Sequence, residues 1–217
     1  ISCFALFGNA AAQNPDRIDY TLTIDAADLT GFTVHMRIAQ APSNFVVAAH
    51  AHPEYDDKYW RFLEDMRAEG ATVTRLDSVR WQVSNARDVV TLSYRVVLPP
   101  TPAPRAAWRA YLTATGGLVG GPHAFLYVVN AEEAAARVTL RLPESWSAAP
   151  GMTQEGDAFT APDMFTLMES PIMTGELRSL SRVSRTLSSR PAARPRYGVK
   201  DTGEAPTSID RGPVSLS

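Results

Sequence analysis

Two histidines and three carboxylates lie close together in the sequence, and such residues can bind a metal ion or transfer protons. His50 and His52 are separated by one residue, so on a strand their imidazoles would point to the same face. Zinc sites use three or four protein or water ligands, and Glu54, Asp56 or Asp57 could supply the others. The spacing therefore permits a metal site in this stretch.

A structural role is the competing interpretation of the same residues. Pro53 would end a strand at the two histidines, and the acidic run after it would begin a helix. The chain contains no H-E-x-x-H zinc motif, and the other histidines, His35 and His123, have no further ligand types beside them. We favour the structural role and assign no catalytic residue, no metal ligand and no cofactor-binding residue.

Other catalytic motifs are also absent from the sequence. No G-x-S-x-G nucleophile motif occurs, and Cys3 is the single cysteine. The glycine pairs at 116–117 and 120–121 are not followed by the G-K-[ST] of a phosphate-binding loop. The stretch TGGLVGGPH, residues 115–123, is instead predicted to be a flexible loop between strands.

Composition suits a soluble globular domain with appendages. The chain has 217 residues, of which 45% are hydrophobic and 20% charged, and a net charge of −2. This charge gives no reason to expect nucleic acid as a partner, and no apolar run is long enough for a membrane span. The segment ISCFALFGNAAAQ ends in an A-x-A pattern, so residues 1–12 are predicted to be a signal-peptide remnant of a secreted or periplasmic protein. A lipid-modified Cys3 or an ordinary N-terminal strand are the alternatives.

The charge is unevenly distributed along the chain. Residues 1–177 carry 13 Lys and Arg against 20 Asp and Glu, whereas residues 178–217 carry 8 against 3, so the two parts have net charges of −7 and +5. The second part is rich in Ser, Arg and Pro and poor in large apolar residues, which predicts a disordered basic tail. A truncated or frameshifted gene would produce such a tail, and a natural tail that binds an anionic partner is the alternative.

Several segments have the apolar pattern of strands. Period-two alternation, which indicates one buried face, occurs in residues 18–25, 31–39, 88–98 and 137–143. Continuous apolar runs of strand length occur in residues 44–50 and 123–130. Many short strands with few helices predict a mainly β protein, an antiparallel β-sandwich with one or two short helices.

Two segments have helical spacing. In residues 56–70, Asp56 or Asp57 could be the N-cap and Gly70 the stop. The apolar positions of this segment are Tyr59, Phe62, Leu63 and Met66. In residues 161–170, Pro162 lies near the start, and the apolar side would consist of Met164, Leu167 and Met168.

Residues 18–177 resemble the N-terminal domain of the M61 peptidases, the glycyl aminopeptidase family. The resemblance rests on the order and spacing of Y-R-V at 94–96, L-P-x-x-W at 142–146 and S-P-I…G at 170–175. Many members have W-x-P-G-x-Y where this chain has its two histidines and a proline, and only Tyr55 of that pattern is kept.

The resemblance implies a β-sandwich that carries no chemistry of its own. In this family zinc and its H-E-x-x-H motif belong to a thermolysin-like catalytic domain, which would be the partner of residues 18–177. The chain as given lacks that motif, so we expect a non-catalytic domain, truncated before the zinc domain, that packs against the catalytic domain and shapes its substrate cleft. No catalytic residue is carried over, and no cofactor is expected in this chain.

A free-standing sandwich that binds a peptide or glycan is the alternative function. Aromatic side chains commonly carry such recognition, and they also commonly form contacts between domains. The candidate surface or interdomain contacts are Tyr55, Tyr59, Trp60, Trp108 and Tyr111.

Overall fold

The computed structural model describes residues 14–50, 62–98 and 110–177. All of them lie in one unit of the chain, Ile1–Ser179. The predicted signal remnant and the predicted basic tail fall outside the described residues and stay predictions.

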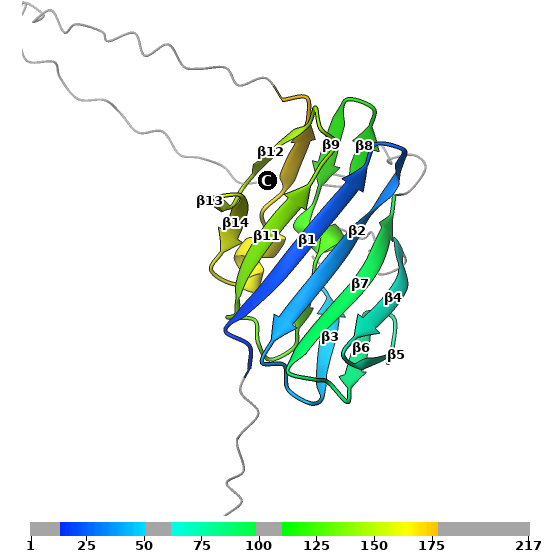
Figure 1. The fold of residues 1–217 in the computed structure, drawn as a ribbon, viewed down its shortest axis with the longest axis vertical. Helices are drawn as coiled ribbons and strands as arrows, with labels where there is room; N and C mark the ends of the chain where they lie inside the picture. The colour runs from blue at the N-terminus through cyan, green and yellow to red at the C-terminus, as the bar shows by residue number, and fades with distance from the viewer. Residues whose placement is uncertain (1–13, 51–61, 99–109, 178–217) are drawn as a thin grey trace, which may run out of the picture. The chain divides into compact units, whose positions relative to one another are not determined.

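A seven-stranded sheet forms one layer of the fold, nearest the viewer in Figure 1. In order across the sheet its strands are β13 (Thr153–Glu155), β14 (Ala158–Ala161), β11 (Ala135–Arg141), β1 (Arg17–Asp25), β2 (Asp28–Ala39), β7 (Val89–Val97) and β4 (Leu63–Glu69). Neighbours pair antiparallel except β1 and β11, which are parallel. The prediction of a mainly β, antiparallel fold is confirmed, with this one parallel pair inside it.

The period-two patterns fold as predicted because each puts one row of apolar side chains on the same face. Residues 18–25, 31–39, 88–98 and 137–143 correspond to β1, β2, β7 and β11. Every second residue along the first three strands is buried, as in the pattern eBiBiBiBe of β1.

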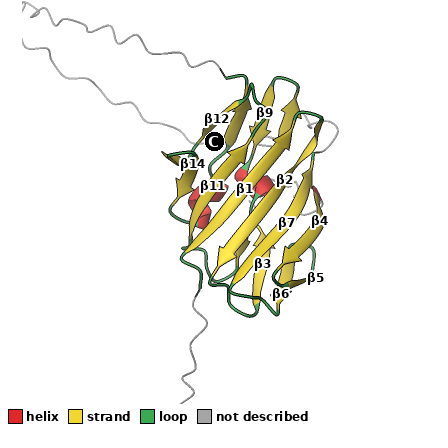
Figure 2. Cartoon of the chain, in the orientation of Figure 1, coloured by secondary structure: helices red, strands yellow, loops and turns green. Residues whose placement is uncertain are grey.

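Two smaller sheets and both helices cover the apolar face of the large sheet. One small sheet has the order β10 (Leu126–Val128), β3 (Phe45–Ala49), β6 (Arg80–Ser84) and β5 (Thr72–Arg75). The other has the order β12 (Ser147–Pro150), β15 (Ile172–Gly175), β9 (Gly116–Val119) and β8 (Tyr111–Thr113). The short helices are α1 (Gly121–Ala124) and α2 (Met164–Met168), which lie behind the large sheet in Figure 2. Buried residues from all three sheets and both helices form a single core cluster.

A buried tyrosine ties the second layer to the first. Tyr20 of β1 is 2% exposed, and its hydroxyl donates a hydrogen bond of 2.8 Å to the carbonyl of Leu126 in β10. Its ring meets Phe125 edge to face, with 5.1 Å between ring centroids. Because a buried hydroxyl without a partner would cost stability, this bond fixes where β10 can lie over the sheet.

The helix predicted for residues 56–70 is wrong in its second half. Residues 63–69 form β4, which pairs antiparallel with β7. The pairing register shifts between Glu64 and Arg67, and Asp65 has a φ of 53°. Such a bulge adds a residue to one strand, so Leu63 and Met66 reach the same face although they are three apart. In the sequence, this three-residue spacing of apolar side chains is the same as that of a helix, which explains the wrong prediction.

Two other predictions need correction. The predicted glycine loop, residues 115–123, contains β9 and the start of α1. The predicted strand at 123–130 begins only at Leu126, because His123 and Ala124 belong to α1. Glycine is needed in β9 for close approach: a Cβ on Gly117 would lie 2.1 Å from the carbonyl oxygen of Tyr111. The glycines therefore allow tight strand packing, not a flexible loop.

The second predicted helix is confirmed as α2. Asp163 is its N-cap, and the carboxylate accepts a hydrogen bond of 2.7 Å from the Thr166 amide. Met164, Leu167 and Met168 are the buried residues of the helix, as their spacing predicted. In the described part of the chain, neither helix has the length and apolar content needed to cross a bilayer.

Candidate interaction surfaces

The outward face of the seven-stranded sheet is polar. Asp19 on β1 lies opposite Arg137 of β11 on one side and Arg37 of β2 on the other. Its carboxylate is 3.3 Å from the Arg37 guanidinium and 3.0 Å from that of Arg17. These side chains are in contact with solvent, so each ion pair contributes about 0–1 kcal/mol to stability. The face is therefore a well-solvated polar surface.

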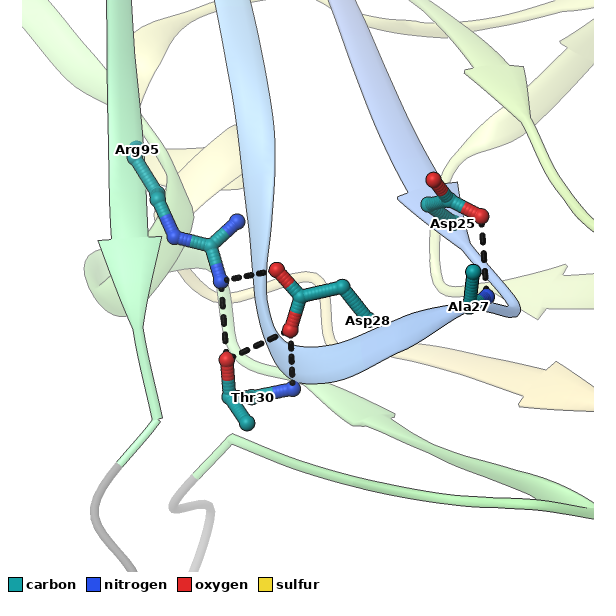
Figure 3. A network of polar contacts seen from close by, with 5 residues as sticks. All are labelled: Asp25, Ala27, Asp28, Thr30 and Arg95. Atoms are coloured by element: carbon teal, nitrogen blue, oxygen red, sulfur yellow. Dashed lines mark hydrogen bonds and ion pairs between the residues drawn. The ribbon is translucent and has the colours of Figure 1, made fainter.

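One polar network ties the β1–β2 hairpin to β7 on this face (Figure 3). The Asp28 carboxylate accepts hydrogen bonds from the amide and hydroxyl of Thr30, at 3.1 and 2.5 Å, and from Arg95 at 2.9 Å. Arg95 also donates to the Thr30 hydroxyl at 2.9 Å. The Thr30 hydrogen bonds, and then the Arg95 charge, lower the pKa of Asp28. A neighbouring bond from the Ala27 amide to Asp25, 2.9 Å long, closes the turn.

A shallow polar hollow of about 300 Å³ lies on the same face. It is lined by Asp19, Thr21, His35, Arg37, Thr91 and Arg141. The Arg37 side chain is paired with Asp19, whereas the side chains of His35 and Arg141 form no hydrogen bond or ion pair to another described residue. Charged and hydroxyl groups around a hollow can bind a small anionic ligand.

The small sheet β12–β15–β9–β8 carries a row of apolar residues on its outward side. Met173 of β15 pairs with Leu118 of β9, and Leu118 pairs with Tyr111 of β8. Ala149 of β12 extends the row, because it pairs with Met173 on the other side. Met173 is 55% exposed and Tyr111 45%, and Ala149 is exposed as well. Side chains directly opposite on neighbouring strands are in contact distance, so the four residues form one continuous apolar row.

This layered domain with one polar and one partly apolar outer surface matches a known family over most of its length. Residues 19–176 match the Peptidase M61 N-terminal domain. The chain belongs to this family. The M61 resemblance seen in residues 18–177 is thereby confirmed. No curated protein matches the chain.

One solved structure shows the same fold as this chain, and two others are more distantly similar. An aminopeptidase N family protein from Idiomarina loihiensis superposes with a TM-score of 0.62 and 21% identity, over 73% of this chain and 29% of that chain. An M1 zinc metallopeptidase from Deinococcus radiodurans gives 0.44 and 12%, over 75% and 42%. Yeast LTA4 hydrolase gives 0.43 and 10%, over 76% and 29%. The present chain therefore covers less than half of the length of each of these chains.

Of the predicted contact residues, only Tyr111 lies in the described part, in the apolar row on β8. Tyr55, Tyr59, Trp60 and Trp108 lie outside it. Sequence reasoning missed the row's other members, Leu118, Met173 and Ala149. Their strands are three or four residues long, which is too short to show a clear alternation in the sequence.

Of the two histidines for which a structural role is predicted, only His50 lies in the described residues. His50 follows β3, and its ring meets that of Tyr127 edge to face at 6.4 Å. His52 and the three carboxylates near it lie outside the described residues. Within the described ranges, no group of three or more His, Cys, Asp or Glu is placed to hold a metal ion.

Proposed function

We propose that this chain serves as the non-catalytic domain of an M61-type peptidase. In the whole enzyme it packs against the zinc-containing catalytic domain and helps to wall the substrate cleft. The observation that carries the proposal is the match of residues 19–176 to the N-terminal domain of this family. The partner is the catalytic domain, and zinc is bound there and not by this chain.

Two further observations support the proposal. The sequence has no H-E-x-x-H motif, so it lacks the two histidines one helical turn apart that such enzymes use for zinc. The apolar row on β8, β9 and β15 gives the domain a surface of the kind that other protein domains cover.

An activity assay tests the non-catalytic part. The purified chain, supplied with Zn²⁺, is incubated with glycyl and alanyl arylamides, and we expect no hydrolysis above a buffer blank. A zinc aminopeptidase assayed in parallel controls for the substrates. Turnover that a chelator abolishes and Zn²⁺ restores would overturn this part of the proposal.

A domain replacement tests the packing part. Residues 19–176 are placed in the Idiomarina loihiensis protein in exchange for its matched region, and the chimera is unfolded in a calorimeter. We expect one cooperative transition, because a large apolar interface couples the unfolding of two domains that otherwise unfold separately. Two transitions, one at the melting temperature of the present chain alone, would show that the domain does not pack there and would refute the proposal.

The proposed location is outside the cytoplasm, in the periplasm or the medium. It is supported by the apolar start and A-x-A pattern of residues 1–12. The location is tested with a C-terminal reporter that is active only after export, fused to the product of the complete gene, because residues 1–12 are expected to be only the end of a signal peptide. A reporter that stays silent would contradict the location.

The hollow on the seven-stranded sheet favours a second candidate function, binding of a peptide or an acidic glycan. The side chains of His35 and Arg141 line it without hydrogen bonds or ion pairs to other described residues, and both can pair with a carboxylate. Titration of the chain with glucuronic acid, followed by the His35 ring resonances, tests this function. Resonances that do not move at millimolar ligand would exclude it.

A further inference from the structure

We infer that the apolar row Ala149–Met173–Leu118–Tyr111 is the surface through which this domain docks on the domain that follows it in an M61 peptidase. The inference rests on the proposed function, and it specifies which side of the sandwich faces the partner. The partner's chemistry follows from the row: an apolar protein surface, not a charged or glycan one.

A comparison of the two outer surfaces indicates that the apolar row, and not the large sheet, is the docking surface. On the seven-stranded sheet, the outward positions in the middle of β1, β2, β7 and β11 hold Asp, Thr, Ser, His and Arg. Such a face is stable in water without a partner. On the small sheet, Met173 and Tyr111 expose about half of their surface, and both flank Leu118. Clustered exposed apolar side chains mark contact surfaces more often than single ones do.

The path of the chain indicates which domain covers the apolar row. β15 is the last strand of the matched region, and Gly175 ends it two residues after Met173. Leu177, the last described residue, is itself 38% exposed. In Figure 1 the chain leaves the sandwich beside β9 and β12. A domain that follows residues 19–176 in the same polypeptide therefore begins next to the row, and its local concentration there is high.

The geometry of the strands makes the row a rigid platform. Gly175 lies opposite Gly116, and a Cβ on Gly175 would lie 2.5 Å from the Cα of Gly116. On the inward side, Ile172 and Val119 pair with each other and are 1% and 0% exposed. The strands that carry the row are therefore closely paired and are packed on the core on their inward side, so their backbones are ordered before docking.

The test compares charges placed on the row and elsewhere in the Idiomarina loihiensis chimera described above. The double variant Met173→Lys/Tyr111→Lys puts two charges into the row at positions that are already half exposed. The matched control is Leu76→Lys, because Leu76 is 53% exposed but lies between β5 and β6, in a different sheet. Both are also made in the full 217-residue chain, where we expect melting temperatures close to that of the unaltered chain.

We expect the double variant to split the chimera's single calorimetric transition into two and Leu76→Lys to leave it single. If the double variant also leaves one transition, the row is not the docking surface, although the proposed function stands. If the unaltered chimera already shows two transitions, the inferred docking surface and the proposed function are both refuted. Sedimentation of the full chain tests another occupant: a dimer that the double variant dissociates would assign the row to a second copy and overturn the inference.

Discussion

The hydroxyl of Tyr94 accepts a hydrogen bond from the amide of Leu126, with 3.1 Å between oxygen and nitrogen. The same hydroxyl donates to the carbonyl of Ala124 at 2.8 Å. Tyr94 is on β7 in the first layer, whereas its two partners lie where α1 passes into β10 in the second. One buried side chain thus satisfies two backbone groups that no strand ladder reaches, and it joins the layers at that point.

Removal of this hydroxyl should destabilise the domain more than any other tyrosine-to-phenylalanine change in the described residues. Tyr94→Phe leaves a buried amide and a buried carbonyl without their partner, so we expect a loss of about 1–3 kcal/mol in the free energy of unfolding. Tyr20→Phe removes a single bond and should cost less. Urea denaturation measures both, with Tyr111→Phe as an exposed control that should change stability by less than about 0.5 kcal/mol. Equal stabilities for Tyr94→Phe and Tyr111→Phe would contradict the role of the hydroxyl.

The same tyrosines should make the domain sensitive to alkali. Burial raises the pKa of Tyr94, and burial together with the nearby Tyr94 raises the pKa of Tyr20. The unfolded chain, in which tyrosine titrates near pH 10, therefore releases these protons first. Their contribution is fully present below about pH 10 and is lost as the pH rises from there toward the folded-state pKa. Denaturation from pH 8 to 12 should show this decline, and Tyr94→Phe should make it shallower. A wild-type profile that stays flat above pH 10 would be inconsistent with buried phenols.

Gly31 should not tolerate a side chain. A Cβ at this position of β2 would lie 2.3 Å from the Val96 carbonyl oxygen and 2.9 Å from the Arg95 guanidinium. Gly31→Ala should therefore push β2 and β7 apart and disturb the Asp28–Arg95 pair, at a cost of about 1–3 kcal/mol. Gly151→Ala is the control, because its Cβ would meet Ser170 at an ordinary 3.4 Å. Thermal melts of the two variants decide the question, and similar melting temperatures would count against the predicted clash.

The N-cap of α2 should contribute measurably to the free energy of unfolding. Asp163→Ala removes the acceptor of the Thr166 amide, and we expect a loss of about 1 kcal/mol. Asp163→Asn keeps an acceptor oxygen and should retain most of the stability. Chemical denaturation of the pair separates loss of the cap from loss of the charge. If both variants are equally destabilised, the cap's hydrogen bond is not what stabilises the helix.

Methionine oxidation should report which surface is open in the isolated chain. Met173 is 55% exposed, whereas Met36 and Met168 are 0% and 3% exposed. In dilute hydrogen peroxide, the Met173 thioether should form its sulfoxide first, as followed by peptide mass spectrometry. Slow oxidation of Met173 in the full chain would mean that residues beyond the described ones cover the apolar row.

Long alternating segments could be predicted from the sequence because a period of two has one interpretation over eight or nine residues. β1, β2, β7 and β11 were found in this way, and α2 was found from its proline, its cap and its apolar spacing. β4 was not, because the bulge at Asp65 converts a strand pattern into a helix-like one. The spacing of apolar residues alone cannot distinguish a bulged strand from a helix, because the bulge is defined by the pairing with β7.

The candidate surface was harder to predict than the fold. Tyr111 was named because aromatic residues commonly form contacts, but Met173 and Leu118 have no such signal. What joins the three is the register of β8, β9 and β15, and these strands come from sequence positions up to 64 residues apart. The register follows from glycines that permit close strand approach, which the sequence alone suggested to be a loop.

The parallel pairing of β1 with β11 also has a consequence for synthesis on the ribosome. Arg17 pairs with Ala135, a separation of 118 residues. At about 5–20 residues per second, β1 and β2 can form their hairpin while the other edge of β1 waits roughly 6–24 s for its neighbour. Throughout that interval β1 has an open edge, and Tyr20 lacks its contacts with Phe125 and Leu126 until those residues are made near its end. The nascent domain therefore depends on a late strand to close its centre, and this delay is where a chaperone would be needed.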